Sequence, residues 1–133
     1  MEEQTRIILT NLCMVYREDG SFLVQWRKKN DWPGINFPGG HVEREESVLE
    51  SVRREMKEET GLLVSNLLPC GYFEWNVPKE GVRHLSLLFK TKDYSGTLRS
   101  SEEGPMLWLK EEDLKNYPLS TDFLLLYEQM KRY

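Results

Sequence analysis

The sequence predicts a single α/β domain, residues 1–133, built around a mixed β-sheet. Two stretches have the apolar spacing of amphipathic helices, one within residues 40–62 and one over residues 120–133. Strand-like apolar runs lie before the first helix and between the two helices. Because such elements usually pack in layers, we expect the helices to cover a sheet. A chain of 133 residues is long enough to bury one core of this kind.

The N-terminal part of the sheet is predicted to be a β-hairpin. Residues 6–16 and 21–28 have the composition of strands, and the turn signal Glu18-Asp19-Gly20 separates them. Successive side chains of a strand point to opposite faces, so Arg27 is expected to face away from Trp26.

A glycine turn and an acidic helix follow the hairpin. A loop over residues 29–37 leads into Phe37-Pro38-Gly39-Gly40, where the paired glycines allow the backbone to approach a ligand closely. At about 100° per residue, Glu55, Glu58 and Glu59 fall within roughly a 100° arc of the helix. Carboxylates this close repel one another. The arrangement therefore indicates a site for a hard cation such as Mg²⁺, which prefers oxygen ligands and often a substrate phosphate.

The remaining residues of this helix predict which face it buries and where it ends. Its apolar stripe is expected to face the core, and Glu59, at the border of that stripe, is expected to be the most enclosed of the three acids. Arg54 and Glu58 are four residues apart and can pair, which offsets part of the repulsion. Gly61 is expected to end the helix in the left-handed region. The stripe consists of Val48, Leu49, Val52 and Met56.

Between the two helices we expect strands separated by loops. Residues 62–76 carry two strand segments, broken near residues 68–71, and a loop follows over residues 76–81. Residues 82–92 form a long strand, and residues 94–104 form a polar loop.

The C-terminal part predicts a last strand and a closing helix. Residues 106–109 are a short strand, and residues 111–116 are a short helix. The closing helix is expected over residues 120–133, with Ser120 or Thr121 as its N-cap. Its core stripe is expected to contain Leu124, Tyr127 and Met130.

Composition and charge argue against several functions. The formal net charge of −4 argues against binding to a nucleic-acid polymer, and no apolar run is long enough for a membrane span. The acidic segment Met1-Glu2-Glu3-Gln4 does not resemble a signal peptide. Cys13 and Cys70 lack the spacing of metal ligands, so we expect two reduced thiols and a cytoplasmic location.

The stretch from Gly40 to Leu62 resembles the Nudix box, the signature of the Nudix hydrolase family. The family pattern is Gly, five residues, Glu, seven residues, Arg-Glu, an aliphatic residue, any residue, Glu-Glu, any residue, Gly and an aliphatic residue. Many members have Gly directly before the first Glu, where this chain has Glu45, a difference that bears on loop shape more than on chemistry. Every fixed position is filled, by Gly40, Glu46, Arg54, Glu55, Met56, Glu58, Glu59, Gly61 and Leu62.

The resemblance implies an α/β/α sandwich and hydrolysis of a nucleoside diphosphate linked to another group. It implies Mg²⁺ as the cofactor, with Mn²⁺ as an alternative. Glu55, Glu58 and Glu59 would be metal ligands, joined by the carbonyl oxygen of Gly39. Glu55 would alternatively serve as the general base.

The same resemblance implies roles for further residues. Arg54 would orient a carboxylate rather than touch the substrate, and Glu46 would either pair with Arg54 or be an ordinary first-turn acid. Many members carry a further acid on the loop before a short strand with a Trp. Here that acid is Glu103, with Glu102 as the alternative, acting as a metal ligand or as a base. Two adjacent solvated acids are the competing interpretation.

The substrate contacts are expected from five residues. Arg27 would bind phosphate, because a fixed guanidinium matches phosphate geometry, and Gly40 would let the backbone approach it. His41 stands where some relatives have Lys, and either contacts phosphate or has no role. Trp32 would form a pocket rim. Asp122 would read the base or be an acid near a helix N-terminus.

The substrate itself is predicted less directly. Chain length, the Arg27 strand and the segment around Trp108 resemble the MutT-like branch of the family, which converts oxidised purine nucleoside triphosphates, typically 8-oxo-dGTP, to the monophosphate and pyrophosphate. One alternative is a Nudix hydrolase acting on ADP-ribose, a nucleotide sugar or a dinucleoside polyphosphate. Another is a non-catalytic nucleotide-sensing module, against which the complete set of acids argues. The sequence leaves the choice between monomer and homodimer open.

Overall fold

The computed structural model describes residues 5–133, with the backbone alone for residues 76–78. The polar segment Met1-Glu2-Glu3-Gln4 lies outside the described residues. The elements, in chain order, are β1 Arg6–Val15, β2 Phe22–Arg27, β3 Gly34–Asn36, β4 Gly39–His41, α1 Val48–Thr60, β5 Leu62–Ser65, β6 Leu68–Val77, the 3₁₀ turn η1 Pro78–Glu80, β7 Val82–Thr91, β8 Asp93–Gly96, β9 Met106–Leu109, the 3₁₀ helix η2 Glu111–Asn116 and α2 Phe123–Lys131.

The central sheet is mixed, as the sequence predicted. Its strand order is β4-β1-β7-β6. β1 and β7 run parallel from the pair Arg6–Val82 to the pair Val15–Thr91, whereas β4 pairs antiparallel with β1 and β6 pairs antiparallel with β7. A second sheet has the order β3-β2-β9, and β5 pairs with β8.

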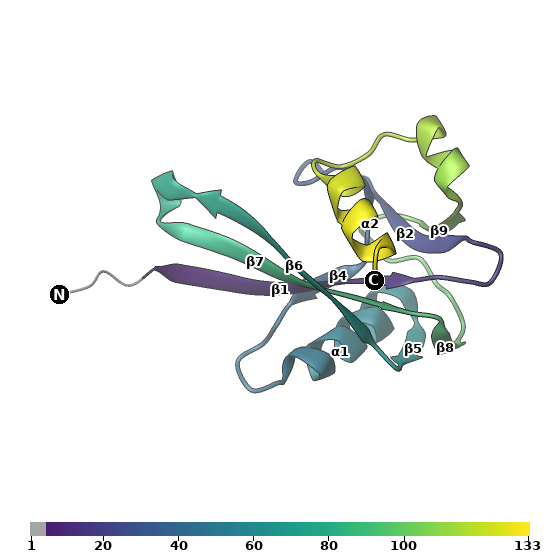
Figure 1. The fold of residues 1–133 in the computed structure, drawn as a ribbon, viewed down its shortest axis with the longest axis horizontal. Helices are drawn as coiled ribbons and strands as arrows, with labels where there is room; N and C mark the ends of the chain where they lie inside the picture. The colour runs from purple at the N-terminus through teal and green to yellow at the C-terminus, as the bar shows by residue number, and fades with distance from the viewer. Residues whose placement is uncertain (1–4) are drawn as a thin grey trace.

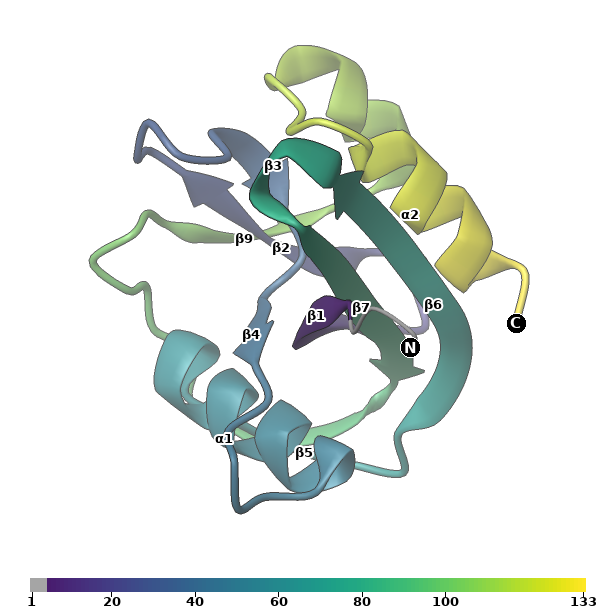
Figure 2. The ribbon, with the colours of Figure 1, turned by 90° about the vertical axis from the view of Figure 1, so that its left-hand side faces the viewer.

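The two helices lie on opposite faces of the central sheet (Figure 1). Figure 2, which looks along the strands, places α1 below the sheet and α2 above it, on the side of β2 and β3. Adjacent residues of the central strands divide between these layers. Cys13 and Phe89 pack with α1, and Met14 and Leu88 pack with α2. The expected α/β/α sandwich is therefore the observed fold.

The expected hairpin of the first two strands does not form. Within the described residues, β1 and β2 form no ladder, and the one bridge beside their turn joins Tyr16 and Phe22. β2 pairs with β3 and β9 instead. The reason is that β4 and β7 bond to the two sides of β1, which leaves no edge for a ladder with β2.

Three boundaries between the helices also differ from expectation. The break between the first two strand segments falls at Asn66, whose φ of 51° ends β5, whereas residues 68–71 lie within β6 and include a bulge. Residues 93–96, expected in a polar loop, form β8 because they pair with β5. The loop expected over residues 76–81 is shorter, since β6 continues to Val77 and a 3₁₀ turn follows.

α1 has the boundaries that its sequence signals indicate. The side chain of Ser47 accepts a hydrogen bond from the amide of Glu50 at 3.1 Å, and the Glu50 carboxylate accepts one from the Ser47 amide at 3.3 Å. This reciprocal pair is a capping box. At the other end, Gly61 has a φ of 80°, as predicted for a left-handed C-terminal stop.

The buried face of α1 differs from the predicted stripe at one position. Val52 and Met56 are fully buried, but Leu49 is 41% exposed. Ser51 is buried instead, and its hydroxyl accepts a hydrogen bond from Nδ2 of Asn11 at 2.8 Å. The helix therefore presents a small polar residue to β1, which Leu49 is too far around the helix to reach.

α2 begins later than expected. It starts at Phe123, and Asp122, rather than Ser120 or Thr121, occupies the N-cap position with a φ of 67°. The hydroxyl of Ser120 donates to the carbonyl of Ile35 at 2.7 Å. That side chain therefore ties the segment to β3 instead of capping the helix.

The buried face of α2 follows from its start at Phe123. Tyr127 and Met130 are buried as predicted, but Leu124 is 53% exposed. The buried positions recur at the spacing of one helix face. They are Phe123, Leu126, Tyr127 and Met130.

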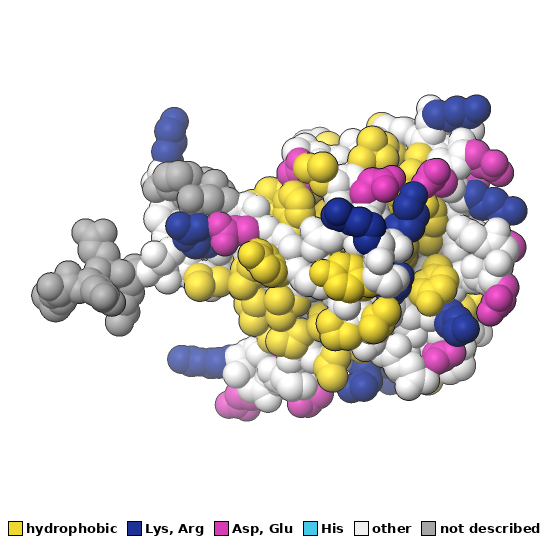
Figure 3. Space-filling model, viewed as in Figure 1, with side chains coloured by type: hydrophobic (Ala, Val, Ile, Leu, Met, Phe, Trp, Pro, Cys, Tyr) yellow, Lys and Arg dark blue, Asp and Glu magenta, His cyan; other side chains and the backbone are white. Residues whose placement is uncertain are grey.

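β6 is an edge strand of the central sheet, and α2 covers part of that edge. The side-chain amide of Gln129 donates to the carbonyls of Cys70 and Tyr72, each at 3.0 Å. Pro69 and the bulge lie in the same part of β6. Leu68 and Tyr72 are exposed, and Figure 3 shows hydrophobic side chains gathered on this face of the molecule.

The described helices and cysteines add two observations. Neither helix within residues 5–133 has the length and apolar composition that a membrane span requires. Cys13 and Cys70 are buried free thiols, and burial raises the pKa of Cys13 to about 12.

We expect Leu126→Ala to lower the free energy of unfolding by about 2–5 kcal/mol, because it leaves a cavity in the core. Leu124→Ala, in the same helix but on its exposed face, is the matched control and should change that free energy by less than about 0.5 kcal/mol. Urea unfolding followed by circular dichroism measures both. Equal losses in the two variants would contradict the buried face assigned to α2.

Candidate active site

The three carboxylates of α1 share one side of the helix but have different surroundings. The Glu55 side chain is 12% exposed and that of Glu58 is 58% exposed. Glu59 is half-buried at the border of the apolar stripe. The sequence predicted Glu59 as the most enclosed acid, but Glu55 is enclosed as well, because its carboxylate packs against β4.

Two glycines allow β4 to approach its neighbours so closely. A Cβ atom at Gly40 would lie 2.5–2.7 Å from the carboxyl atoms of Glu55. A Cβ atom at Gly39 would collide with the carbonyl oxygen of Asn11 on β1. A larger residue at Gly40 would displace the Glu55 carboxylate, and one at Gly39 would push the backbone of β1 away from β4.

The carbonyl groups of β4 are divided between β1 and the site. The carbonyl of Pro38 and the amide of Val42 bond to β1. Because alternate residues of an antiparallel strand bond to the partner, the carbonyls of Gly39 and His41 point to the free side. The His41 carbonyl accepts a hydrogen bond from Arg54 of α1 at 3.0 Å, so this free side faces the acids. The His41 side chain is exposed.

Arg54 holds the acids in place. Its guanidinium donates to both oxygens of Glu46, at 3.0 and 2.7 Å, to Glu55 at 2.9 Å and to Glu58 at 3.2 Å. The pairings expected with Glu46 and Glu58 are both present. Hydrogen bonds from Arg54, with a further one from the amide of Glu43, lower the pKa of Glu46 to about 2. Glu46 precedes the helix, so it is not a first-turn acid.

The loop before β9 carries Glu103, and Arg27 of β2 binds it. Nη1 of Arg27 donates to Glu103 at 2.6 Å, Nη2 donates to both carboxylate oxygens of Asp31 at 3.1 Å, and Nε donates to the Asp31 carbonyl at 2.7 Å. The Arg27 side chain is 17% exposed. All three nitrogens are therefore engaged within the protein, and Arg27 must exchange a partner before it binds a phosphate.

Glu59 faces the same loop. Burial raises its pKa, and the charge of Glu103 raises it further, whereas hydrogen bonds from Ser101 and Gln25 oppose the shift. Glu59 and Glu103, on separate elements, are thus close enough to interact. Sequence reasoning missed Gln25 and Ser101, because a strand glutamine and a loop serine match no motif. The alternation of side chains along a strand, which separates Arg27 from Trp26, also places Gln25 on the same side of β2 as Arg27.

Aromatic residues continue the site beyond Arg27. The rings of Trp32 and Trp75 meet edge to face, with centroids 5.4 Å apart, and Nε1 of Trp75 donates to Asp122 at 2.9 Å. Trp32 is 45% exposed. Because Asp31 precedes Trp32 and binds Arg27, contacts run without a break from Glu103 to Asp122. We call Trp32, Trp75 and Asp122 the aromatic ledge, and Glu55, Glu58, Glu59 and Glu103 the acidic strip.

The acidic strip fits a cation of the magnesium type by its chemistry. Its donors are all oxygens, and burial followed by the charges of neighbouring carboxylates raises the pKa of Glu55 against the influence of Arg54. Within residues 5–133, no three acidic, histidine or cysteine side chains converge as a preformed metal cluster. Mg²⁺ is usually held by one or two carboxylates together with substrate phosphates, rather than by a closed protein cage. The open strip suits that mode of binding.

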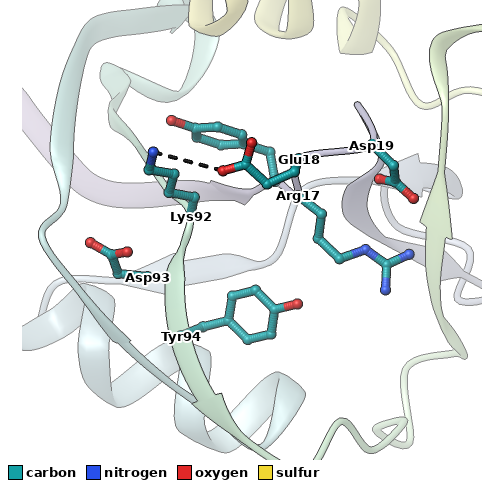
Figure 4. Close-up of a pocket in the computed structure, with 7 residues that line it drawn as sticks. Arg17, Glu18, Asp19, Lys92, Asp93 and Tyr94 are labelled. Atoms are coloured by element: carbon teal, nitrogen blue, oxygen red, sulfur yellow. Dashed lines mark ion pairs between the residues drawn. The ribbon is translucent and has the colours of Figure 1, made fainter.

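A separate hollow of about 540 Å³ lies beside the turn between β1 and β2 (Figure 4). Glu18 and Lys92 form an ion pair across it at 3.9 Å. It shares no residue with the acidic strip or the aromatic ledge, and its mixture of charges favours no class of ligand. Its lining residues are Tyr16, Arg17, Glu18, Asp19, Lys92, Asp93 and Tyr94.

Carboxylate oxygens that an arginine holds beside a glycine strand suit a hydrolase of nucleoside diphosphate derivatives, because such ligands can bind a cation that meets a phosphate chain. The protein is a hydrolase of this class. It belongs to the Nudix family, since the NUDIX domain model matches residues 8–127.

Three similar proteins are named as hydrolases. The chain is 33% identical over 113 residues to the uncharacterised Nudix hydrolase YvcI of Bacillus subtilis, covering 81% of this chain and 69% of YvcI. It is 30% identical over 95 residues to the 8-oxo-dGTP diphosphatase of Buchnera aphidicola, covering 70% and 73%. It is 29% identical over 122 residues to the CTP pyrophosphohydrolase of Escherichia coli, covering 88% and 87%.

A solved structure agrees with the fold. The MutT Nudix hydrolase of Burkholderia pseudomallei superposes with a TM-score of 0.82 at 24% identity, over 96% of this chain and 98% of that one. The protein is therefore a Nudix hydrolase whose fold matches that of the MutT structure. A non-catalytic sensing module, the second alternative from the sequence, does not agree with relatives named as hydrolases.

We expect Glu46→Gln to lower the free energy of unfolding at neutral pH, because it removes the carboxylate that Arg54 binds twice. The pKa of Glu46 falls from its ordinary 4.5 to about 2 on folding. Its contribution is therefore complete above the ordinary value and is lost as the pH falls toward the lowered one.

Urea unfolding between about pH 6 and about pH 3 measures this difference between wild type and variant, which should shrink as the pH falls. Glu45→Gln, at the exposed neighbouring position, is the matched control. A difference that stays constant over this range would contradict the role of the Glu46 carboxylate.

Proposed function

We propose that the protein is a Mg²⁺-dependent diphosphatase, with Mn²⁺ as an alternative cofactor, that converts an oxidised purine nucleoside triphosphate such as 8-oxo-dGTP to the monophosphate and pyrophosphate. The observation that carries the proposal is the unbroken series of contacts from the acidic strip through Arg27 to the aromatic ledge. A triphosphate needs a cation at its anionic end and an aromatic surface for its base. The acidic strip offers the first and the aromatic ledge offers the second, and Arg27 lies between them.

The acidic strip would hold the cation. Glu55, Glu58 and Glu59 supply carboxylate oxygens, the Gly39 carbonyl supplies another oxygen on the free side of β4, and Glu103 approaches from the loop. When bound, the cation screens the phosphate charge and orients the attacking water.

Residues of the chain itself position the acids, accept the proton of the water and contact the phosphates at this end of the site. Arg54 fixes Glu55 and Glu58, so they do not have to be ordered when the cation arrives. The proton of the attacking water passes to a carboxylate oxygen of Glu55 or of Glu103, each of which an arginine holds in place. Gly40 lets the backbone approach the phosphates, and the exposed His41 side chain lies next to it.

The other end of the site would bind the base. The exposed ring of Trp32 is available for stacking. One oxygen of Asp122 accepts from Trp75, and its second oxygen can accept a hydrogen bond from the edge of a base. Arg27, between the two ends, would exchange Glu103 or Asp31 for a phosphate oxygen.

A substrate panel tests this assignment. Wild-type protein with Mg²⁺ should release pyrophosphate from 8-oxo-dGTP faster than from dGTP or CTP, and far faster than it cleaves ADP-ribose, a nucleotide sugar or a dinucleoside polyphosphate. The name of the Buchnera relative favours the first of these, and the name of the Escherichia coli relative makes CTP its competitor. Preferred cleavage of ADP-ribose, or release of phosphate without pyrophosphate, would overturn the proposal.

Glu58→Gln and Glu59→Gln should each lower kcat by a factor on the order of 10²–10³ while leaving the fold intact, because charge stabilisation at the cation is lost. Steady-state kinetics with saturating Mg²⁺ measures the loss, and circular dichroism checks the fold. Glu128→Gln, an exposed acid of α2, is the control. Rates near those of the wild type would remove the two residues from the metal site.

Arg27→Ala should raise the KM for the triphosphate by roughly ten- to a hundredfold, as expected for a lost hydrogen bond to a charged group. Affinity for Mn²⁺ without nucleotide should change much less, because Arg27 is not a ligand. Arg83→Ala is the matched control. Nη1 of Arg83 lies 2.6 Å from a carboxylate oxygen of Glu74, and neither residue belongs to the acidic strip. An unchanged KM would exclude Arg27 from phosphate binding.

A further inference from the structure

Arg27 is bound by two carboxylates that come from different loops. Asp31, between β2 and β3, accepts three of its hydrogen bonds: the two carboxylate oxygens accept from Nη2 at 3.1 Å, and the carbonyl oxygen accepts from Nε at 2.7 Å. Glu103, in the loop before β9, accepts one bond from Nη1 at 2.6 Å. Asp31 therefore orients the guanidinium, and Glu103 occupies its remaining nitrogen.

The two partners of Arg27 are not equally easy to exchange. If Glu103 leaves, three bonds to Asp31 still hold the plane of the guanidinium. If Asp31 leaves, one bond remains, about which the guanidinium can turn. A phosphate oxygen that replaces Glu103 therefore meets a donor that is already oriented. The exchange that phosphate binding requires thus falls at Nη1.

The backbone of Glu103 is fixed, so its side chain alone has to move. Its amide donates to the hydroxyl of Ser101 at 3.2 Å, and its carbonyl accepts from the amide of Lys28 at 3.0 Å. The amide of Trp26 donates to the carbonyl of Pro105 at 2.9 Å. The loop is bonded to β2 at these points, and the Glu103 carboxylate can leave Arg27 by a change of rotamer.

The same loop begins at the C-terminal end of α1. The guanidinium of Arg99 donates to the carbonyls of Lys57 and Glu58, each at 3.1 Å. The amide of Arg99 donates to the carbonyl of Thr60 at 2.9 Å. The loop therefore runs from the acidic end of α1 to β2, and Glu103 lies on this path.

The charges in this group disfavour phosphate binding while the ion pair is closed. Arg27 contributes one positive charge, and Asp31 and Glu103 contribute one negative charge each, so the group has an excess of negative charge. Such an excess repels a phosphate. A divalent cation attracts carboxylate oxygens strongly. When the Glu103 carboxylate turns to a cation, Arg27 keeps Asp31 and has a free donor at Nη1.

We infer that the ion pair between Arg27 and Glu103 couples cation binding to phosphate binding: Arg27 is withheld from a phosphate until Glu103 turns to the cation. This inference rests on the proposed function, which makes Glu103 a metal ligand. It goes beyond that proposal in assigning the cooperation between the two ends of the site to one ion pair. Because such coupling is reciprocal, a phosphate on Arg27 also leaves Glu103 free for the cation.

The test measures binding of inorganic pyrophosphate without metal, in EDTA, by isothermal titration calorimetry. Glu103→Ala should bind pyrophosphate roughly three- to fivefold more tightly than the wild type, as expected when a partly exposed ion pair is removed. Loss of a metal ligand alone would not change this metal-free affinity. Glu102→Ala removes the same charge from the adjacent exposed position, and this matched control should change the affinity by less than about twofold.

A double-mutant cycle tests whether the gain acts through Arg27. In the Arg27→Ala protein, adding Glu103→Ala should change pyrophosphate affinity by no more than adding Glu102→Ala does, because the donor to be released is absent. Thermal unfolding of each variant checks that binding is measured on folded protein.

The outcomes separate this inference from the proposed function. If Glu103→Ala gains no affinity, or if Glu102→Ala gains as much, the coupling is wrong while the metal site stands. A gain that persists in the Arg27→Ala protein would also overturn it. If the wild type takes up no Mn²⁺ with or without pyrophosphate, as followed by the electron paramagnetic resonance signal of free Mn²⁺, the proposed function fails and the coupling loses its cation.

Discussion

The guanidinium of Arg54 holds together the part of the molecule on which the candidate site depends. Three carboxylates on one side of a helix repel one another and would weaken the helix by themselves. Arg54 offsets this by bonding to Glu55 and Glu58, while two further bonds reach Glu46 in the loop before α1 and another reaches the His41 carbonyl on β4. Loop, helix and edge strand therefore keep fixed relative positions without a ligand.

The rest of the site depends on how closely β4 approaches α1 and the loop before β9 approaches β2. Gly40 leaves room for the Glu55 carboxylate against the backbone. On the other side, Gly104 has no room for a Cβ atom beside the carbonyl of Trp26, so the Glu103 loop lies flat on β2. Because both approaches are made by glycine backbone, Glu55 lies directly against β4 and Glu103 is held close to β2.

The sequence predicted the features that depend on local spacing and missed those that depend on tertiary pairing. The pairing of Arg54 with Glu46, the stop at Gly61 and the mixed sheet follow from motif positions and periodicity, and all are present. The hairpin failed because β7, distant in sequence, takes the edge of β1. The contact between Gln25 and Ser101 was missed, since it joins residues 76 positions apart and no local spacing reveals it.

The edge of the central sheet at β6 bears on how the protein behaves at high concentration. An open edge strand with exposed apolar side chains is a template on which another chain can add a strand and start aggregation. Here Gln129 already occupies the carbonyls of Cys70 and Tyr72, Pro69 removes a donor, and the bulge interrupts the regular ladder. The stretch of β6 that exposes Leu68 and Tyr72 is thus the stretch least able to recruit a foreign strand.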